Sequence, residues 1–191
     1  MDLPDKARLL QRARSGRAAW AGAHRPPREA VREGQESVWD FPRPPAVQPS
    51  SARARVVFAG RTVADSCSTV RVVETASAPV VAFPTRDVDL TLLSLNGRMS
   101  VCEWKGAAVY YDLTAQDRVS RDAAYTYPDP FDDLAEGYAA IAGLIAFYPG
   151  RVDEAWLDDE RVRPQPGGYY AGWVTSRLAG PIKGERGTEG W

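Results

Sequence analysis

From residue 53 to residue 163 the sequence is a series of short runs rich in β-branched and apolar residues, each bounded by turn-forming residues. Runs of this kind are typical of β-strands, and no long helical runs alternate with them. The pattern therefore predicts a single compact, mainly β domain of short antiparallel strands with minor helix, and it argues against a doubly wound nucleotide-binding sheet. We expect strands at residues 55–59, 62–65, 69–75, 79–84, 98–103, 107–113, 123–127, 144–148 and 152–157.

Turn residues are predicted to join several of these strands into hairpins. Gly60-Arg61 indicates a type II′ turn, Trp104-Lys105-Gly106 a second hairpin, and Pro149-Gly150 a third between the last two strands. Two short helices are expected as well, at residues 87–94 with Asp87 as the cap and at residues 133–142 before Gly143.

The chain is predicted to have four parts, of which the β-rich core at residues 53–163 is one. Residues 1–36 form a basic arm with eight Lys and Arg against five acidic residues, and residues 3–14 could form a helix. Residues 37–52 form a proline-rich extended strap anchored by Trp39 and Phe41. Residues 164–191 contain seven Gly and three Pro together with several aromatic residues, so we expect an irregular tail packed back on the domain.

Charge and composition exclude several classes of function. The formal net charge is −1, so no global basic field attracts nucleic acid or an anionic membrane. No apolar run approaches the length of about 18 residues that a membrane span needs, and no signal peptide is evident. The two cysteines, Cys67 and Cys102, lack zinc-ligand spacing and fit reduced thiols. We therefore expect a cytoplasmic protein without a metal or cofactor.

Several motifs occur in an order that resembles the domain-of-unknown-function 427 family. They include an Arg-x-x-Glu strand from Arg71 to Glu74, the turn Cys102-Glu103-Trp104-Lys105-Gly106, and Ala124-Tyr125-Thr126-Tyr127. The resemblance covers roughly residues 53–163, and the strap and tail look like a longer version of the family. It implies a small domain of the β-tent type with no established reaction, although the family has carried a nucleotidyltransferase-like label.

The sequence has one histidine, His24, which lies in the arm, so acid–base chemistry in the core must come from other residues. Glu74 lies on an apolar strand face, where a carboxylate is either paired or the best general base. Cys102 could be a nucleophile or a small buried residue. Lys105 could bind an anion, form a Schiff base or be a solvated turn lysine.

The pair Asp87-Val88-Asp89 could in principle hold Mg²⁺ for nucleotidyl transfer. No glycine-rich phosphate loop accompanies it, so this function is disfavoured.

Aromatic residues are the strongest compositional signal, with six Trp and eight Tyr. They could wall a cavity for a flat ligand or fill an ordinary core. We expect Trp39 and Trp173 to close over one mouth of the sheet near Trp104. The set predicted to bind a ligand is Trp39, Arg71, Trp104, Lys105, Tyr110, Tyr125, Tyr127 and Trp173.

The preferred interpretation is therefore a protein that binds a small aromatic or anionic molecule near Lys105. A first alternative is a metal-independent enzyme that uses Glu74, Cys102 or Lys105. A second is an interaction protein that forms a homodimer through its strap and tail.

Overall fold

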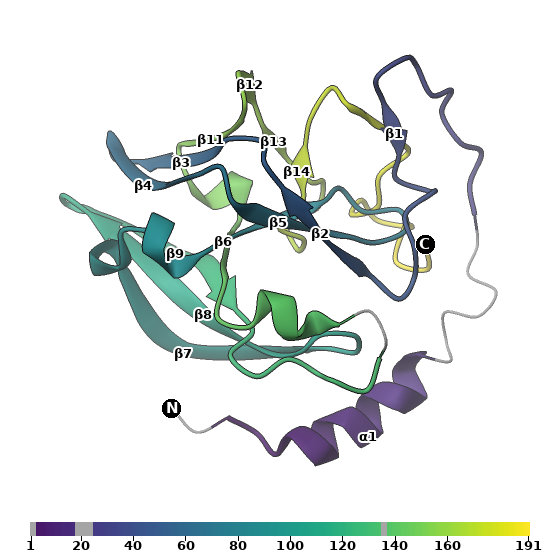
Figure 1. Cartoon of the computed structure of the whole chain (residues 1–191), viewed down its shortest axis with the longest axis horizontal. Helices are drawn as coiled ribbons and strands as arrows, with labels where there is room; N and C mark the ends of the chain where they lie inside the picture. Colours follow the sequence, from purple (N-terminus) through teal and green to yellow (C-terminus); the bar gives the residue numbers. More distant parts are fainter. Residues whose placement is uncertain (1–2, 18–24, 135–136) are drawn as a thin grey trace.

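The computed structural model describes residues 3–17, 25–134 and 137–191, and strands predominate in this part of the chain (Figure 1). The prediction of a mainly β fold is confirmed, and α1 is the one α-helix among the residues described. His24 lies outside them. The helices and strands are α1 (Lys6–Arg17), β1 (Glu36–Ser37), β2 (Ala46–Ser50), β3 (Ala54–Phe58), β4 (Arg61–Ser66), β5 (Thr69–Val73), β6 (Val80–Phe83), β7 (Leu93–Cys102), β8 (Gly106–Ala115), β9 (Arg118–Thr126), β10 (Ile145–Phe147), β11 (Glu154–Leu157), β12 (Glu160–Arg161), β13 (Arg163–Pro164), β14 (Trp173–Val174) and β15 (Leu178–Ala179).

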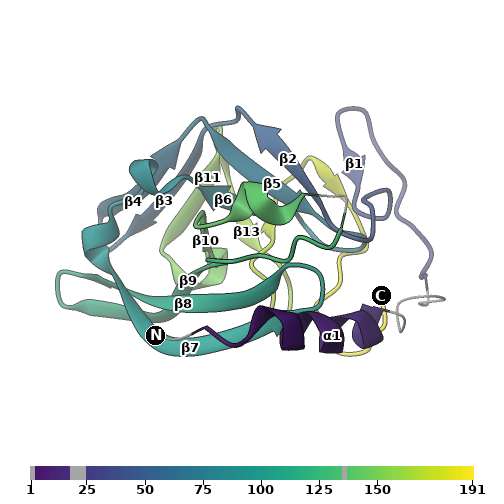
Figure 2. The ribbon, with the colours of Figure 1, turned by 60° about the horizontal axis from the view of Figure 1, so that its bottom comes forward.

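Two antiparallel sheets make up most of the fold. The larger has seven strands in the order β2-β5-β6-β10-β9-β8-β7, and the smaller has four in the order β12-β11-β3-β4. Figure 2 shows α1 running along β7 and β8. Within the described ranges no helix combines the length and the apolar character that crossing a membrane requires.

Alternation of side chains along the seven-stranded sheet gives it two different faces. On β10, Ile145 and Phe147 belong to the main core between the two sheets, whereas Ala146 belongs to a cluster on the opposite face. The same holds on β6, where Phe83 faces the core and Ala82 faces the other side. Because successive side chains of a strand point to opposite faces, one sheet both closes the core and forms a wall of the candidate site.

The strap and the tail pack back on the two sheets. In the strap, β2 pairs with β5 as an edge strand of the larger sheet. In the tail, β15 pairs with β1, and the indole rings of Trp191 and Trp39 lie 5.6 Å apart. The expectation that the tail returns to the domain is therefore confirmed.

Local turn chemistry differs from the sequence prediction in two places. The β3–β4 turn has Ala59 and Gly60 at its centre, both with positive φ, so it has the type I′ signature and not that of type II′. Asp89, and not Asp87, caps the short 3₁₀ turn Leu90–Leu92, because its side chain accepts a hydrogen bond from the Thr91 N–H. The strand β7 begins directly after this turn, which leaves no room for the predicted helix at residues 87–94.

Two longer-range predictions are also wrong. The strands β10 and β11 do not form a hairpin, because β10 pairs with β6 and β9 while β11 pairs with β3 and β12. The 3₁₀ turn Pro149–Arg151 carries the chain from one sheet to the other. Of the predicted helix at 133–142, the described part contains the 3₁₀ turn Tyr138–Ile141, and residues 135–136 lie outside the description.

Candidate binding cavity

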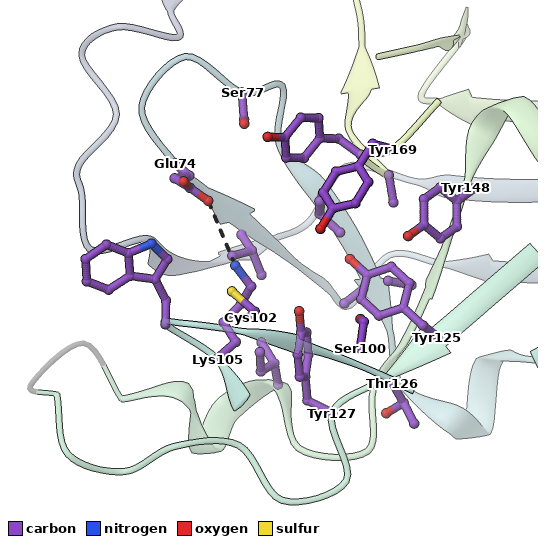
Figure 3. Close-up of a pocket in the computed structure, with 18 of the residues that line it drawn as sticks. Glu74, Ser77, Ser100, Cys102, Lys105, Tyr125, Thr126, Tyr127, Tyr148 and Tyr169 are labelled. Carbon is purple, nitrogen blue, oxygen red and sulfur yellow. Dashed lines mark ion pairs between the residues drawn. The ribbon is translucent and has the colours of Figure 1, made fainter. Parts of the chain in front are cut away.

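A cavity of about 250 Å³ lies on the face of the seven-stranded sheet that turns away from the main core (Figure 3). Its walls come from β5 to β10, from the turn between β7 and β8, and from the tail. Seven residues that the sequence singled out line it: Glu74, Cys102, Trp104, Lys105, Tyr110, Tyr125 and Tyr127. Tertiary structure thus brings most of the predicted site residues to one place.

Glu74 is the centre of a cluster of charges at one end of the cavity. Its carboxylate lies 3.2 Å from the Lys183 ammonium, 3.5 Å from the Arg43 guanidinium and 4.0 Å from the Lys105 ammonium. The side chain of Lys183 is only 3% exposed. The sequence analysis left open whether Glu74 is paired with a cation or faces a cleft. In the structure Glu74 is paired with cations and also lines the cavity.

The pKa values follow from this arrangement. Burial raises the pKa of Glu74, but the cations of Lys105, Lys183 and Arg43 outweigh burial and hold its pKa below the ordinary value. Burial lowers the pKa of Lys105, but the interactions of its ammonium with the neighbouring Cys102 and Glu74 outweigh burial, so its pKa lies above the ordinary value. For Lys183, burial dominates and the pKa is lowered. A carboxylate with a lowered pKa is a weak proton acceptor, and a protonated Lys105 suits charge stabilisation better than imine formation.

The turn that carries Lys105 is held firmly in place. Cys102, the last residue of β7, pairs with Gly106, the first residue of β8, and Gly106 has a φ of 104° that favours glycine. The Lys105 carbonyl accepts a hydrogen bond of 3.1 Å from the Phe131 N–H. From the other side, Arg17 at the end of α1 donates to the Glu103 carbonyl at 2.6 Å. This fixed turn points the Lys105 side chain to the same space as the Cys102 sulfur (Figure 3).

Tyrosine rings form the opposite wall. The rings of Tyr110, Tyr127 and Tyr148 each lie between 5.5 and 5.8 Å from the ring of Tyr125. Burial raises the pKa of Tyr125 and of Tyr127, which keeps their hydroxyl groups protonated and able to donate hydrogen bonds. As predicted from the period of two residues, Tyr125 in β9 and Tyr127, which follows the last residue of β9, lie on the same side of the chain and belong to one cluster.

The tail supplies cavity residues that sequence reasoning missed. Tyr169 and Tyr170 pack edge to face at 4.9 Å, and the Lys183 ammonium lies 4.9 Å from the centre of the Tyr170 ring. The buried amide of Gln165 accepts from the Ala78 N–H and donates to the Lys183 carbonyl. The density of aromatic residues in the tail signalled that it packs on the domain, but no local pattern indicated that it reaches Glu74.

Three of the predicted ligand-binding residues lie elsewhere. Trp173 is part of the main core beside Phe83, and Trp39 belongs to a separate cluster with Val73 and Trp191. The expectation that Trp39 and Trp173 close over the cavity near Trp104 is therefore wrong, since each fills its own apolar cluster. Arg71 points from the other face of β5 and donates to Glu36 and Gln48.

The carboxylates of the Asp87-Val88-Asp89 pair are also engaged away from the cavity. Asp87 accepts a hydrogen bond from the Ser66 hydroxyl, and Asp89 pairs with Arg61 in addition to capping its turn. Among the residues that the structure describes, no group of three or more His, Cys, Asp or Glu side chains is arranged to hold a metal ion.

Fold and cavity together define a mainly β protein whose larger sheet and tail enclose one tyrosine-lined space with a charged end. A family model described as NTP_transf_9, domain of unknown function DUF427, matches residues 46–158. The match covers more than half of the chain, so the chain belongs to this family, as its motifs indicated. No curated protein matches the chain. The tail residues that line the cavity lie outside the matched region.

Proposed function

We propose that this protein binds a small molecule in the cavity beside Lys105, with a ring against the tyrosines and a polar or anionic group toward the charged end. The observation that carries this proposal is the convergence of Lys105, Glu74 and six tyrosines on one space. A few polar groups set in mostly aromatic and apolar walls are typical of small-molecule sites. The volume of about 250 Å³ is close to the lower end of the range for such sites, about 300 Å³, which favours a ligand with a single ring.

The charged end of the cavity favours a ligand that carries a group able to accept hydrogen bonds from cations. Lys105 is protonated because its pKa is raised, and the hydroxyl groups of Tyr125 and Tyr127 are donors. A carboxylate, phosphate or carbonyl oxygen of a ligand would accept hydrogen bonds from these donors, and the ring of the ligand would stack against Tyr125 or Tyr148. Location in the cytoplasm remains part of the proposal, since free thiols persist in that compartment.

The test is a binding screen with a variant that fills the cavity. Single-ring carboxylates and phosphates, beginning with benzoate, 4-hydroxybenzoate and phenyl phosphate, are titrated against the full chain while tryptophan fluorescence and the melting temperature are recorded. A compound that binds the folded state raises the melting temperature by mass action. Ala171→Phe places a ring into the cavity wall, and Ala139→Phe makes the same change at an exposed position.

We expect at least one compound to bind the unaltered chain and the Ala139→Phe variant but not the Ala171→Phe variant. A panel in which no compound binds, or in which Ala171→Phe leaves binding unchanged, contradicts the proposal. Homodimerisation through strap and tail stays a prediction, for which sedimentation of the full chain is the measurement.

A further inference from the structure

We propose that Cys102 is a nucleophile that adds to small α,β-unsaturated carbonyl compounds within the cavity, with Lys105 stabilising the negative charge of the reaction. This inference rests on the proposed function, because it uses the same cavity, and it names the chemical class of the ligand as a soft electrophile.

The thiol does not stand alone. Cys102 ends β7 and Lys105 follows it within the β7–β8 turn, so the hairpin itself holds both side chains at the charged end of the cavity. Figure 3 shows the Cys102 sulfur beside the Lys105 amine, with the Glu74 carboxylate on the far side of that amine. Glu74 lies 4.0 Å from the Lys105 ammonium and helps to keep it a cation, so a positive charge lies beside the sulfur at the end of the cavity where an electrophile would be attacked.

The hydrogen-bond donors of the cavity suit the carbonyl oxygen of an α,β-unsaturated ketone, or enone. Carbonyl oxygen accepts hydrogen bonds, and the protonated hydroxyl groups of Tyr125 and Tyr127 and the Lys105 ammonium are donors in the same cavity. Donors that face the oxygen of an enone stabilise the enolate that forms when the β-carbon is attacked. The apolar and aromatic walls accept the carbon skeleton.

The step balances without an oxidant or a reductant. The thiol proton passes to water, and the thiolate sulfur then forms a bond to the β-carbon of the enone as the carbon–carbon π bond breaks. The electron pair of that bond forms a new π bond between the α-carbon and the carbonyl carbon, and the pair of the carbonyl π bond moves to the oxygen, where Lys105 and a tyrosine hydroxyl stabilise the negative charge. The α-carbon then takes a proton from water, which leaves a thioether and regenerates the carbonyl.

The chain carries an internal comparison for this chemistry. Its second cysteine, Cys67, is exposed and lies in the turn between β4 and β5, near the ion pair of Arg53 and Asp65. Cys102 is less exposed than Cys67, so accessibility alone makes Cys67 the faster thiol. If Cys102 nevertheless reacts faster, the residues around its sulfur must cause the higher rate, because its accessibility is lower.

The experiment uses two full-length single-cysteine proteins, Cys67→Ser and Cys102→Ser, treated with 2-cyclohexen-1-one. Intact mass measured over time gives the rate constant, and peptide mapping gives the site. We expect Cys102 to react at least about tenfold faster than Cys67, because Lys105 and the tyrosine hydroxyl groups of the cavity stabilise the enolate that forms there. A maleimide attached to a long polyethylene glycol chain, too large for the cavity, should show the reverse order.

Variants of Lys105 in the Cys67→Ser background test its role. We expect Lys105→Met to slow the reaction about tenfold and Lys105→Arg to keep most of the rate. Lys6→Met removes a lysine of the same length from a surface pair with Asp129 and Asp132 and should leave the rate unchanged. Near-ultraviolet circular dichroism checks that each variant is folded.

The inference is overturned if Cys102 reacts no faster than Cys67, or if folded Lys105→Met reacts as fast as its parent. Should Lys105→Met fail to fold, the comparison of the two single-cysteine proteins with unaltered Lys105 still decides. If ring compounds bind in a way that Ala171→Phe abolishes while Cys102 is unreactive, the proposed function stands and this inference fails. If neither binding nor reaction occurs, both fail.

Discussion

Replacing Glu74 by glutamine should destabilise this protein more than replacing any one of the cations around it. The carboxylate is shared by Lys183, Arg43 and Lys105, whose side chains are only 3%, 12% and 13% exposed. Glu74→Gln keeps the size of the side chain but leaves three largely buried cations facing one another. Lys183→Met removes one cation and leaves the carboxylate with two.

The expected magnitude follows from the distances. At 3.2 Å the Lys183 and Glu74 charges attract each other by about 5 kcal/mol if the effective dielectric constant is about 20. The cost of removing both groups from water offsets part of this attraction, and removing one partner of a buried pair typically costs about 3–5 kcal/mol. We expect a loss of about 3 kcal/mol for Glu74→Gln and about 1 kcal/mol for Lys183→Met. In a chain of this size a loss of about 3 kcal/mol lowers the melting temperature by about 6–12 °C.

Thermal and urea unfolding of the unaltered protein, both single variants and the double variant measure these energies. Because the double variant removes one of the three cations that would repel one another in Glu74→Gln, we expect it to be more stable than the sum of the two single losses implies. The reasoning is refuted if Glu74→Gln melts within about 2 °C of the unaltered protein, a shift of less than about 1 kcal/mol. It is equally refuted if Lys183→Met is the more destabilised of the two.

Two further predictions concern pH and the tail. Because the pKa of Glu74 is lowered on folding, its contribution is full above the unfolded value of about 4.3 and is lost as pH falls through the folded value. The gap in melting temperature between the unaltered protein and Glu74→Gln should therefore narrow from pH 6 to pH 3, and a constant gap would contradict the assignment. In the tail, Gly167 and Gly168 both have positive φ, but only at Gly167 would a Cβ collide with backbone, 1.9 Å from the Gly184 carbonyl oxygen. Gly167→Ala should therefore destabilise the protein by more than Gly168→Ala, by at least about 1 kcal/mol in urea unfolding, and equal losses would show that the tail yields at this contact.

The sequence alone determined the properties that depend on neighbours along the chain. Alternation and turn residues predicted the mainly β fold and the hairpin that carries Cys102 and Lys105. The same period of two residues placed Tyr125 with Tyr127. These inferences are reliable because the geometry of a strand fixes which side chains share a face, whatever the rest of the fold does.

Tertiary structure decided which segments meet. The strands β10 and β11 have the local pattern of a hairpin, yet they belong to different sheets, where β10 lies between β6 and β9 and β11 lies between β3 and β12. The sequence also could not decide the positions of the tryptophans, because an indole ring can fill a core or line a cavity equally well. In the folded chain Trp173 lies in the main core and Trp104 lines the cavity. Lys183 reaches Glu74 across 109 positions of sequence, and no local pattern predicts such a contact. The charged end of the cavity therefore exists only in the folded chain, where a buried carboxylate is stable only if cations lie beside it.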